Sequence, residues 1–157
     1  MGRKLLLSAL AGAIAFAAPA QAQFSDTYKF LEAVKKKDGV VATKLLNEPG
    51  TTVVNAKDVT TGETALHIAV ARGDVTWVRF LLQRGANPNL RDKRGVTPLV
   101  SAASRGFIDC VDELIANRAR LDEANDAGET PVISAVHRRD IPMLRSLVKA
   151  GADPDRS

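Results

Sequence analysis

Histidine and cysteine are scarce in this sequence, which has two His and one Cys among its 157 residues. The single Cys110 cannot form a disulfide within the chain, so the fold has to be held together by packing alone. A zinc site needs three or four nitrogen or sulfur ligands at suitable spacing, and the sequence does not contain them. It also offers no Ser–His–Asp or Cys–His set in which the base has an orienting partner. We therefore expect no catalytic residues, no metal site and no cofactor.

Loops that bind phosphate or calcium are missing as well. The sequence contains neither G-x-x-x-x-G-K-[ST] nor G-x-G-x-x-G. The acidic segment from Asp122 to Glu129 is similar to the start of a calcium loop. However, the twelfth position counted from Asp122 is Ile133, where a bidentate Glu is required, and Gly128 stands at position seven rather than six. This segment is predicted to be an ordinary turn.

The first 22 residues have the pattern of a targeting segment. Arg3 and Lys4 precede an uncharged, largely apolar stretch at 5–18, which Ala20-Gln21-Ala22 follows. A charged start, a short apolar core and an A-x-A site together indicate a secretory signal peptide. A helix over that stretch would span only about 21 Å, which is short of the ~30 Å bilayer core. We therefore predict a cleavable signal peptide at 1–22 and no stable membrane insertion after cleavage.

The location that follows from this segment is the periplasm, with secretion as the alternative. No Cys lies near the cleavage site, which excludes lipid attachment of the kind found in bacterial lipoproteins. The Ala-rich composition is typical of Gram-negative leaders. Removal of Arg3 and Lys4 lowers the formal net charge from +4 to +2, because the segment holds no acidic residue. The remaining charge does not argue for a nucleic-acid partner.

The rest of the chain repeats itself every 33 residues. Thr64-Ala-Leu-His-Ile-Ala69 returns as Thr97-Pro-Leu-Val-Ser-Ala102 and again as Thr130-Pro-Val-Ile-Ser-Ala135. A Gly stands two residues before each Thr, at Gly62, Gly95 and Gly128. A fixed period of this length indicates a solenoid, in which each unit buries its apolar face against its neighbours.

These residues resemble the ankyrin repeat family. Its units run from a glycine turn through T-P-L-H-x-A to an outer helix that ends in L-L-x-x-G-A-D/N. The tails Gly85-Ala-Asn-Pro-Asn89 and Gly151-Ala-Asp-Pro-Asp155 fit that ending. A degenerate unit lies upstream at an offset of 36, where Phe30, Ala33, Asp38 and Leu45-Leu46 align with Leu66, Ala69, Asp74 and Leu81-Leu82.

The resemblance implies an all-α solenoid of about four stacked helix–turn–helix repeats, the first of them degenerate. We expect one ankyrin repeat domain at 23–157, with approximate repeats at 24–57, 58–90, 91–123 and 124–157. The three Thr residues that open the full units should cap their inner helices, and Pro98 and Pro131 should occupy the first helical position. Three apolar residues should be buried between repeats: Leu66, Leu99 and Val132.

Two arginines stand where the family favours glycine at the end of a helix. They are Arg118 and Arg139. If the backbone keeps a positive φ at these positions, each Arg costs about 1 kcal/mol of stability. The glycines at Gly85 and Gly151 should end their outer helices in the left-handed conformation.

By resemblance, the domain binds another protein through its concave side, which the turn tips and the exposed ends of the inner helices form. The candidate partner-binding residues are Arg72, Lys93, Arg94, Ser104, Arg105, Asp126, His137 and Arg138. Three of these, Arg72, Arg105 and Arg138, recur at the repeat spacing and should form a ladder of cations. The ladder either recognises acidic groups on a partner or is an ordinary solvated edge.

We predict a monomeric, non-enzymatic adaptor or inhibitor that binds another protein. In this family the position of His67 is structural and bonds across to neighbouring turns. The alternative function is an envelope-stress or redox-protective factor that acts through Cys110. That residue aligns with Trp77 and Met143 on the outer helix, so it is either a thiol packed in the core or a reactive one.

Overall fold

A computed structural model describes residues 18–156 of the chain, and side chains are described from residue 25 onward. Residues 1–17, which hold most of the predicted signal peptide, lie outside this part. The predicted cleavage site after Ala22 falls within the first described helix. The elements are α1 (Ala18–Lys36), α2 (Gly39–Leu46), the 3₁₀ turn η1 (Val53–Asn55), α3 (Ala65–Ala71), α4 (Val75–Gln83), α5 (Pro98–Arg105), α6 (Ile108–Ala116), α7 (Pro131–His137) and α8 (Ile141–Lys149).

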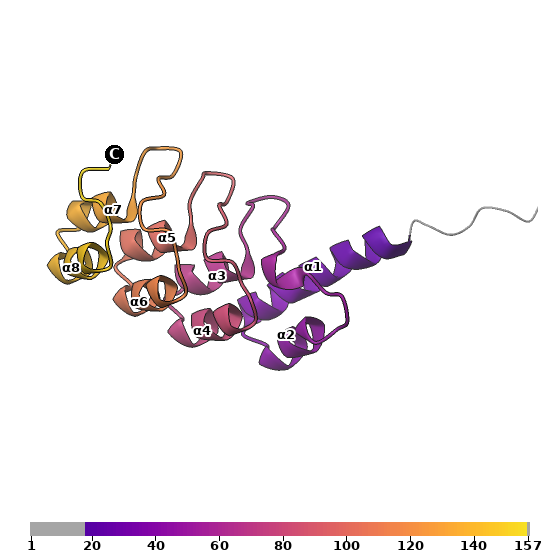
Figure 1. The fold of residues 1–157 in the computed structure, drawn as a ribbon. Helices are drawn as coiled ribbons and strands as arrows, with labels where there is room; N and C mark the ends of the chain where they lie inside the picture. The colour runs from indigo at the N-terminus through magenta and orange to yellow at the C-terminus, as the bar shows by residue number, and fades with distance from the viewer. Residues whose placement is uncertain (1–17, 157) are drawn as a thin grey trace, which may run out of the picture.

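The helices form two layers that run the length of the molecule (Figure 1). Odd-numbered helices make the inner layer, in which α1 packs on α3, α3 on α5 and α5 on α7. Even-numbered helices make the outer layer, and each packs against the inner helix that precedes it. The predicted all-α solenoid of four helix pairs is confirmed. None of the helices within 18–156 has the length and apolar character needed to span a membrane.

The inner helices begin where the sequence predicts. Thr64, Thr97 and Thr130 adopt extended backbone angles, and each hydroxyl accepts a hydrogen bond from the N–H three residues later. Pro98 and Pro131 follow two of these caps at the first helical position, where the missing N–H costs nothing.

Asp residues cap most of the outer helices in the same way. Asp38, Asp74 and Asp140 accept from the N–H three residues on, at 3.0–3.2 Å. Helix α6 instead begins after Phe107, which supplies no side-chain cap. The Phe107 ring lies against Gly73 of the preceding repeat, so closely that a Cβ at Gly73 would lie 3.0 Å from the ring.

The core is a continuous stripe between the two layers. Leu66 and Leu99 are fully buried and Val132 is 3 % exposed, as predicted. Small buried residues let the inner helices approach closely: Ala69, Ala102 and Ala135. In the degenerate first unit Phe30 and Ala33 take the corresponding buried places, which confirms the offset of 36.

Left-handed backbone recurs at the helix ends. Gly85 and Gly151 have φ values of 86° and 105°, and Arg118 and Arg139 keep positive values of 64° and 56°. The predicted strain at the two arginines is therefore present. A third non-glycine residue, Lys37, has φ 59° and occupies the same place in the first repeat as Gly73 does in the next.

Candidate protein-binding surface

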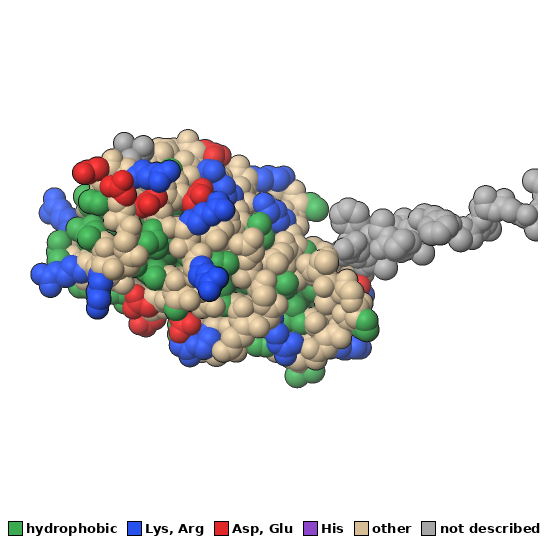
Figure 2. Space-filling view, viewed as in Figure 1, with side chains coloured by type: hydrophobic (Ala, Val, Ile, Leu, Met, Phe, Trp, Pro, Cys, Tyr) green, Lys and Arg blue, Asp and Glu red, His purple; other side chains and the backbone are tan. Residues whose placement is uncertain are grey.

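Three turn tips project beside the inner helices, at 58–63, 91–96 and 124–129 (Figure 1). We call the surface formed by these tips and the inner helices the inner face. In the view of Figure 2, side chains of both charges are mixed over the tips at the upper edge.

One acidic or amide side chain folds each tip. Asp92 Oδ1 accepts from the N–H groups of Arg94 and Val96 at 2.8 and 2.9 Å, and Asn125 Oδ1 accepts from Ala127 and Glu129 at 2.9 and 3.0 Å. Burial alone would raise the pKa of Asp92. The N–H groups of Val96 and Arg94, helped by the Arg94 guanidinium, outweigh it and hold the pKa below its usual value.

Asp58 folds the first tip in the same way, because its Oδ1 accepts hydrogen bonds from the N–H groups of Thr60 and Thr61. Sequence reasoning missed these turn-forming side chains. A signal was present, because Asp92 and Asn125 stand at the repeat spacing, three residues before a Gly.

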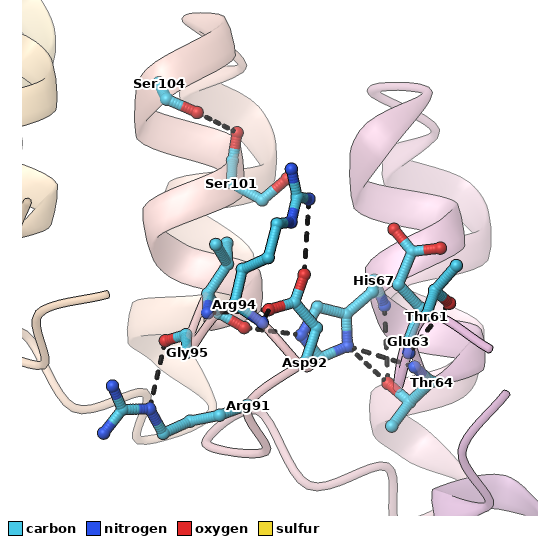
Figure 3. Close-up of polar contacts among 11 residues, drawn as sticks. Thr61, Glu63, Thr64, His67, Arg91, Asp92, Arg94, Gly95, Ser101 and Ser104 are labelled. Carbon is cyan, nitrogen blue, oxygen red and sulfur yellow. Dashed lines mark hydrogen bonds and ion pairs between the residues drawn. The ribbon is translucent and has the colours of Figure 1, made fainter. Parts of the chain in front are cut away.

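His67 ties the second tip to α3, the inner helix of the preceding repeat (Figure 3). The Thr64 N–H donates to Nδ1 at 3.2 Å, so Nε2 carries the proton and donates to the Val96 carbonyl at 3.0 Å. The side chain is buried, and burial lowers the pKa of His67 below its usual value. The predicted structural role of His67 is confirmed, because its ring joins the start of α3 to the second tip.

Neighbouring tips are also joined to one another through main-chain and side-chain bonds. Lys93 donates from its backbone N–H to the Thr61 carbonyl at 3.0 Å and from Nζ to the Val59 carbonyl at 2.6 Å. The Asp126 N–H donates to the Arg94 carbonyl at 3.1 Å. These bonds make the three tips one continuous edge, and they occupy the Lys93 ammonium.

Arg94 and Arg105 are the most available cations in the middle of this face. The Arg94 side chain is 77 % exposed, lies 3.3 Å from Asp92 Oδ2 and extends along α5 towards Ser101 (Figure 3). Arg105 is exposed and makes no hydrogen bond or ion pair within the described part of the chain. The exposed Ser104 hydroxyl donates to the Ser101 carbonyl at 3.1 Å.

The three arginines of the predicted ladder are not equivalent. Arg72 is only partly exposed, and its Nη1 donates to the Val34 and Lys35 carbonyls at 2.9 and 3.1 Å. The last carbonyls of a helix have no partner within that helix, so the guanidinium of the next repeat takes them. Arg72 is therefore tied to α1, unlike Arg105, so the three arginines do not form a ladder of equivalent cations.

Arg138 is intermediate between Arg105, whose side chain makes no bond to the described residues, and Arg72, which is tied to α1. It is exposed, and its Nη1 donates to the Ser104 carbonyl at 3.4 Å. At the same end of the inner face, His137 is 71 % exposed with Nδ1 3.8 Å from Glu129 Oε1. Asp126 remains 65 % exposed beside Arg91, at 3.5 Å. Carboxylates thus accompany His137 and Arg91 at the last tip, whereas Arg105 in the middle of the face has no carboxylate partner within residues 25–156.

Cys110 does not lie on this surface. Its side chain is 1 % exposed, and burial, with smaller contributions from Asp109, Asp74 and Glu113, raises the pKa of the thiol to about 11. A thiol of that pKa is almost wholly protonated at neutral pH, and the thiolate is the reactive form. These observations confirm a core thiol and argue against the redox alternative. No group of three or more His, Cys, Asp or Glu residues within 18–156 is placed to hold a metal ion.

Comparisons with known proteins agree with this geometry. A family model of ankyrin repeats in three copies matches residues 30–122 and 66–157. The chain is 43 % identical to mouse 2-5A-dependent ribonuclease over 75 residues, which are 48 % of this chain and 10 % of that protein. It is 53 % identical to human transient receptor potential cation channel subfamily A member 1 over 38 residues, which are 24 % and 3 %.

A fowlpox virus ankyrin repeat protein is 43 % identical over 47 residues, which are 30 % of this chain and 14 % of the viral protein. The chain therefore spans only a small part of each of these relatives. The family model, in contrast, covers most of the described residues. This chain belongs to the ankyrin repeat family.

Proposed function

We propose that this chain is a non-enzymatic adaptor or inhibitor that is exported to the periplasm and binds a protein partner through its inner face. Ankyrin repeats are protein-interaction modules, which makes protein binding the general role of the fold. The observation that carries the specific proposal is the pair of available cations at the centre of that face, Arg94 and Arg105.

The geometry favours recognition of acidic groups. Arg105 has no carboxylate partner within residues 25–156, and Arg94 shares only the buried Asp92 of its own tip. Hydroxyl groups of Ser101 and Ser104 lie on the same helix and offer additional polar contacts. A partner that brings carboxylates to this region gains charge-assisted hydrogen bonds without breaking any contact of Arg105. Exposed charges raise the association rate and make it sensitive to salt, and an Arg at the centre of an interface can become a hot spot when the partner covers it.

The rigidity of the face supports binding by a preformed surface. His67 bonds the second tip to α3, and Lys93 bonds it to the first tip. The Asp126 N–H bonds the third tip to the second. A preorganised surface loses less conformational freedom when it binds. The inner face is therefore suited to a folded partner that meets several tips at once.

Binding through the inner face is tested with three baits in extracts of the periplasm. The baits are the wild-type protein, Arg105→Glu and, as a matched charge reversal on the exposed outer helix α8, Arg145→Glu. We expect the wild type and Arg145→Glu to retain the same protein and Arg105→Glu to retain at most a tenth of it at moderate salt. Equal retention by all three baits would assign the binding to another surface.

Export rests on the first 22 residues, with their basic start, apolar stretch and Ala20-Gln21-Ala22 site. Mass spectrometry of protein from the periplasmic fraction should find Gln23 at the N-terminus. Ala22→Arg, which places a long charged side chain at the cleavage site, should leave an uncleaved precursor in the membrane fraction. Full-length wild-type protein confined to the cytoplasm would contradict the proposed export.

A further inference from the structure

The outer layer opens between its first two helices. A hollow of about 240 Å³ lies there, lined by Lys37 and Gly39 at the start of α2 and by Thr76, Trp77 and Phe80 on α4. Further along, α4 packs on α6 and α6 on α8, whereas α2 and α4 do not pack closely. Gly39 contributes to the opening, because it has no side chain and nothing lies within 4 Å of the place that a Cβ would take.

Aromatic side chains form one wall of this hollow. Trp77 and Phe80 meet edge to face, with centroids 5.4 Å apart and planes at 78°. Both rings remain partly exposed. On α2, Val40 follows Gly39 and is 82 % exposed. Partly exposed aromatic rings beside an exposed aliphatic residue are typical of surfaces that bind other proteins.

A cation that has no carboxylate partner in the described part of the chain lies against the Phe80 wall of the hollow. The Arg84 guanidinium lies 5.4 Å from the Phe80 centroid and donates to the neutral Asn47 Oδ1 at 2.7 Å. Lys44, one helical turn beyond Val40, is exposed and forms no ion pair within residues 25–156. In the view of Figure 2, Lys and Arg side chains lie over α2 and α4 at the lower edge, with hydrophobic side chains among them.

Two acidic side chains at the start of α2 and of α4 already have partners. Asp74 Oδ2 lies 2.7 Å from Lys37 Nζ, and its other oxygen caps α4. Asp38 caps α2 by accepting from the Val41 N–H at 3.0 Å. Arg84 therefore stands against one ring of the hollow as a cation without a carboxylate partner among the described residues.

We propose that the hollow between α2 and α4 is a second docking site, which takes an acidic protein segment with one apolar side chain flanked by Asp or Glu. The apolar side chain would contact Trp77 and Phe80, and a flanking carboxylate would pair with Arg84. The volume suits one side chain, since sites for drug-sized molecules usually exceed about 300 Å³. Because the aromatic rings line a recess, they favour an inserted side chain over a flat lipid surface.

This site is separate from the inner face and does not depend on the function proposed for that face. Trp77 provides a direct probe, because it is the only Trp in the chain. The full-length protein is titrated with short blocked peptides in which one Leu, Met or Phe is flanked by Glu residues. Control peptides carry Ser in place of the apolar residue, or Gln in place of each Glu.

We expect a saturable change in Trp77 emission with the acidic, apolar peptides. Affinity should weaken as salt is raised, because the bordering cations are exposed. The Ser and Gln control peptides should bind at least tenfold more weakly. Arg84→Glu should reduce affinity at least tenfold, whereas the matched reversals Arg145→Glu on α8 and Arg105→Glu on the inner face should leave it unchanged.

Three results would overturn the proposal. The first is the absence of any change in Trp77 emission with all the acidic, apolar peptides. The second is equal affinity of wild type and Arg84→Glu, with circular dichroism showing that the variant is folded. The third is a response to vesicles of anionic phospholipid without a response to the peptides, which would assign the hollow to a membrane surface. Loss of partner binding in Arg105→Glu alone would bear only on the inner face.

Discussion

The backbone at Arg118 and Arg139 makes a quantitative prediction about stability. Both residues have left-handed φ values, 64° and 56°, which cost a non-glycine residue about 1–2 kcal/mol. Both side chains are exposed and form no hydrogen bond or ion pair in the part of the chain that the structure describes. Replacing either with Gly removes the strain and loses no side-chain contact. Glycine also makes the unfolded chain more flexible, which offsets about 0.4–1 kcal/mol of the gain.

We therefore expect Arg118→Gly and Arg139→Gly each to raise the free energy of unfolding by about 0.5–1 kcal/mol. Lys37→Gly relieves the same strain but removes the ion pair to Asp74, so its gain should be smaller. As a matched control, Arg145→Gly removes an exposed Arg from the middle of α8, where glycine costs about 1 kcal/mol.

Urea denaturation followed by circular dichroism measures these differences. The predicted order of stability is Arg118→Gly and Arg139→Gly above wild type, with Arg145→Gly below it. For a domain of this size each kcal/mol corresponds to roughly 2–4 °C in melting temperature. A loss of stability in both Arg118→Gly and Arg139→Gly, similar to the loss in Arg145→Gly, would refute the assignment of strain to these positions.

Three further outcomes follow from burial. Leu99→Ala should lower the free energy of unfolding by about 2–5 kcal/mol in urea denaturation, and Leu121→Ala should lower it clearly less, because Leu99 is fully buried and Leu121 is only partly buried. Equal losses in the two variants would contradict the repeat register. Burial lowers the pKa of His67, so the unfolded state binds more protons than the folded state as the pH falls. The free energy of unfolding should therefore decrease below about pH 6.5, and His67→Gln should reduce this decrease between pH 7 and 5. Because the pKa of Cys110 is raised to about 11, alkylation of the native protein at pH 8 should be at least about a hundredfold slower than in denaturant, and comparable rates would revive the redox alternative.

Features that depend on one repeat could be predicted from the sequence. The Thr caps, the Pro residues at the first helical position and the buried places of Leu66 and Leu99 follow from local patterns that recur every 33 residues. The positive φ at Arg118 and Arg139 followed from the same register. The shared register also located the degenerate first unit, although its inner helix begins with different residues.

Features that depend on contacts between particular repeats could not be predicted in this way. Arg72 aligns with Arg105 in sequence, yet Arg72 reaches the last carbonyls of α1, and Arg105 does not make the equivalent bonds. The hollow beside Trp77 arises from the distance between α2 and α4, which the 36-residue offset alone does not determine. Asp92 and Asn125 were within reach of sequence reasoning, since turn-forming Asx residues carry a positional signal.

The most direct test of inner-face binding is titration calorimetry with the isolated partner. The wild type is compared with Arg105→Glu, whose exposed side chain makes no contact that the fold requires, and with Arg145→Glu as the matched reversal. We predict that Arg105→Glu weakens binding at least tenfold, about 1.4 kcal/mol, while Arg145→Glu binds as the wild type does. Unchanged affinity in a folded Arg105→Glu variant would contradict recognition through the centre of the inner face.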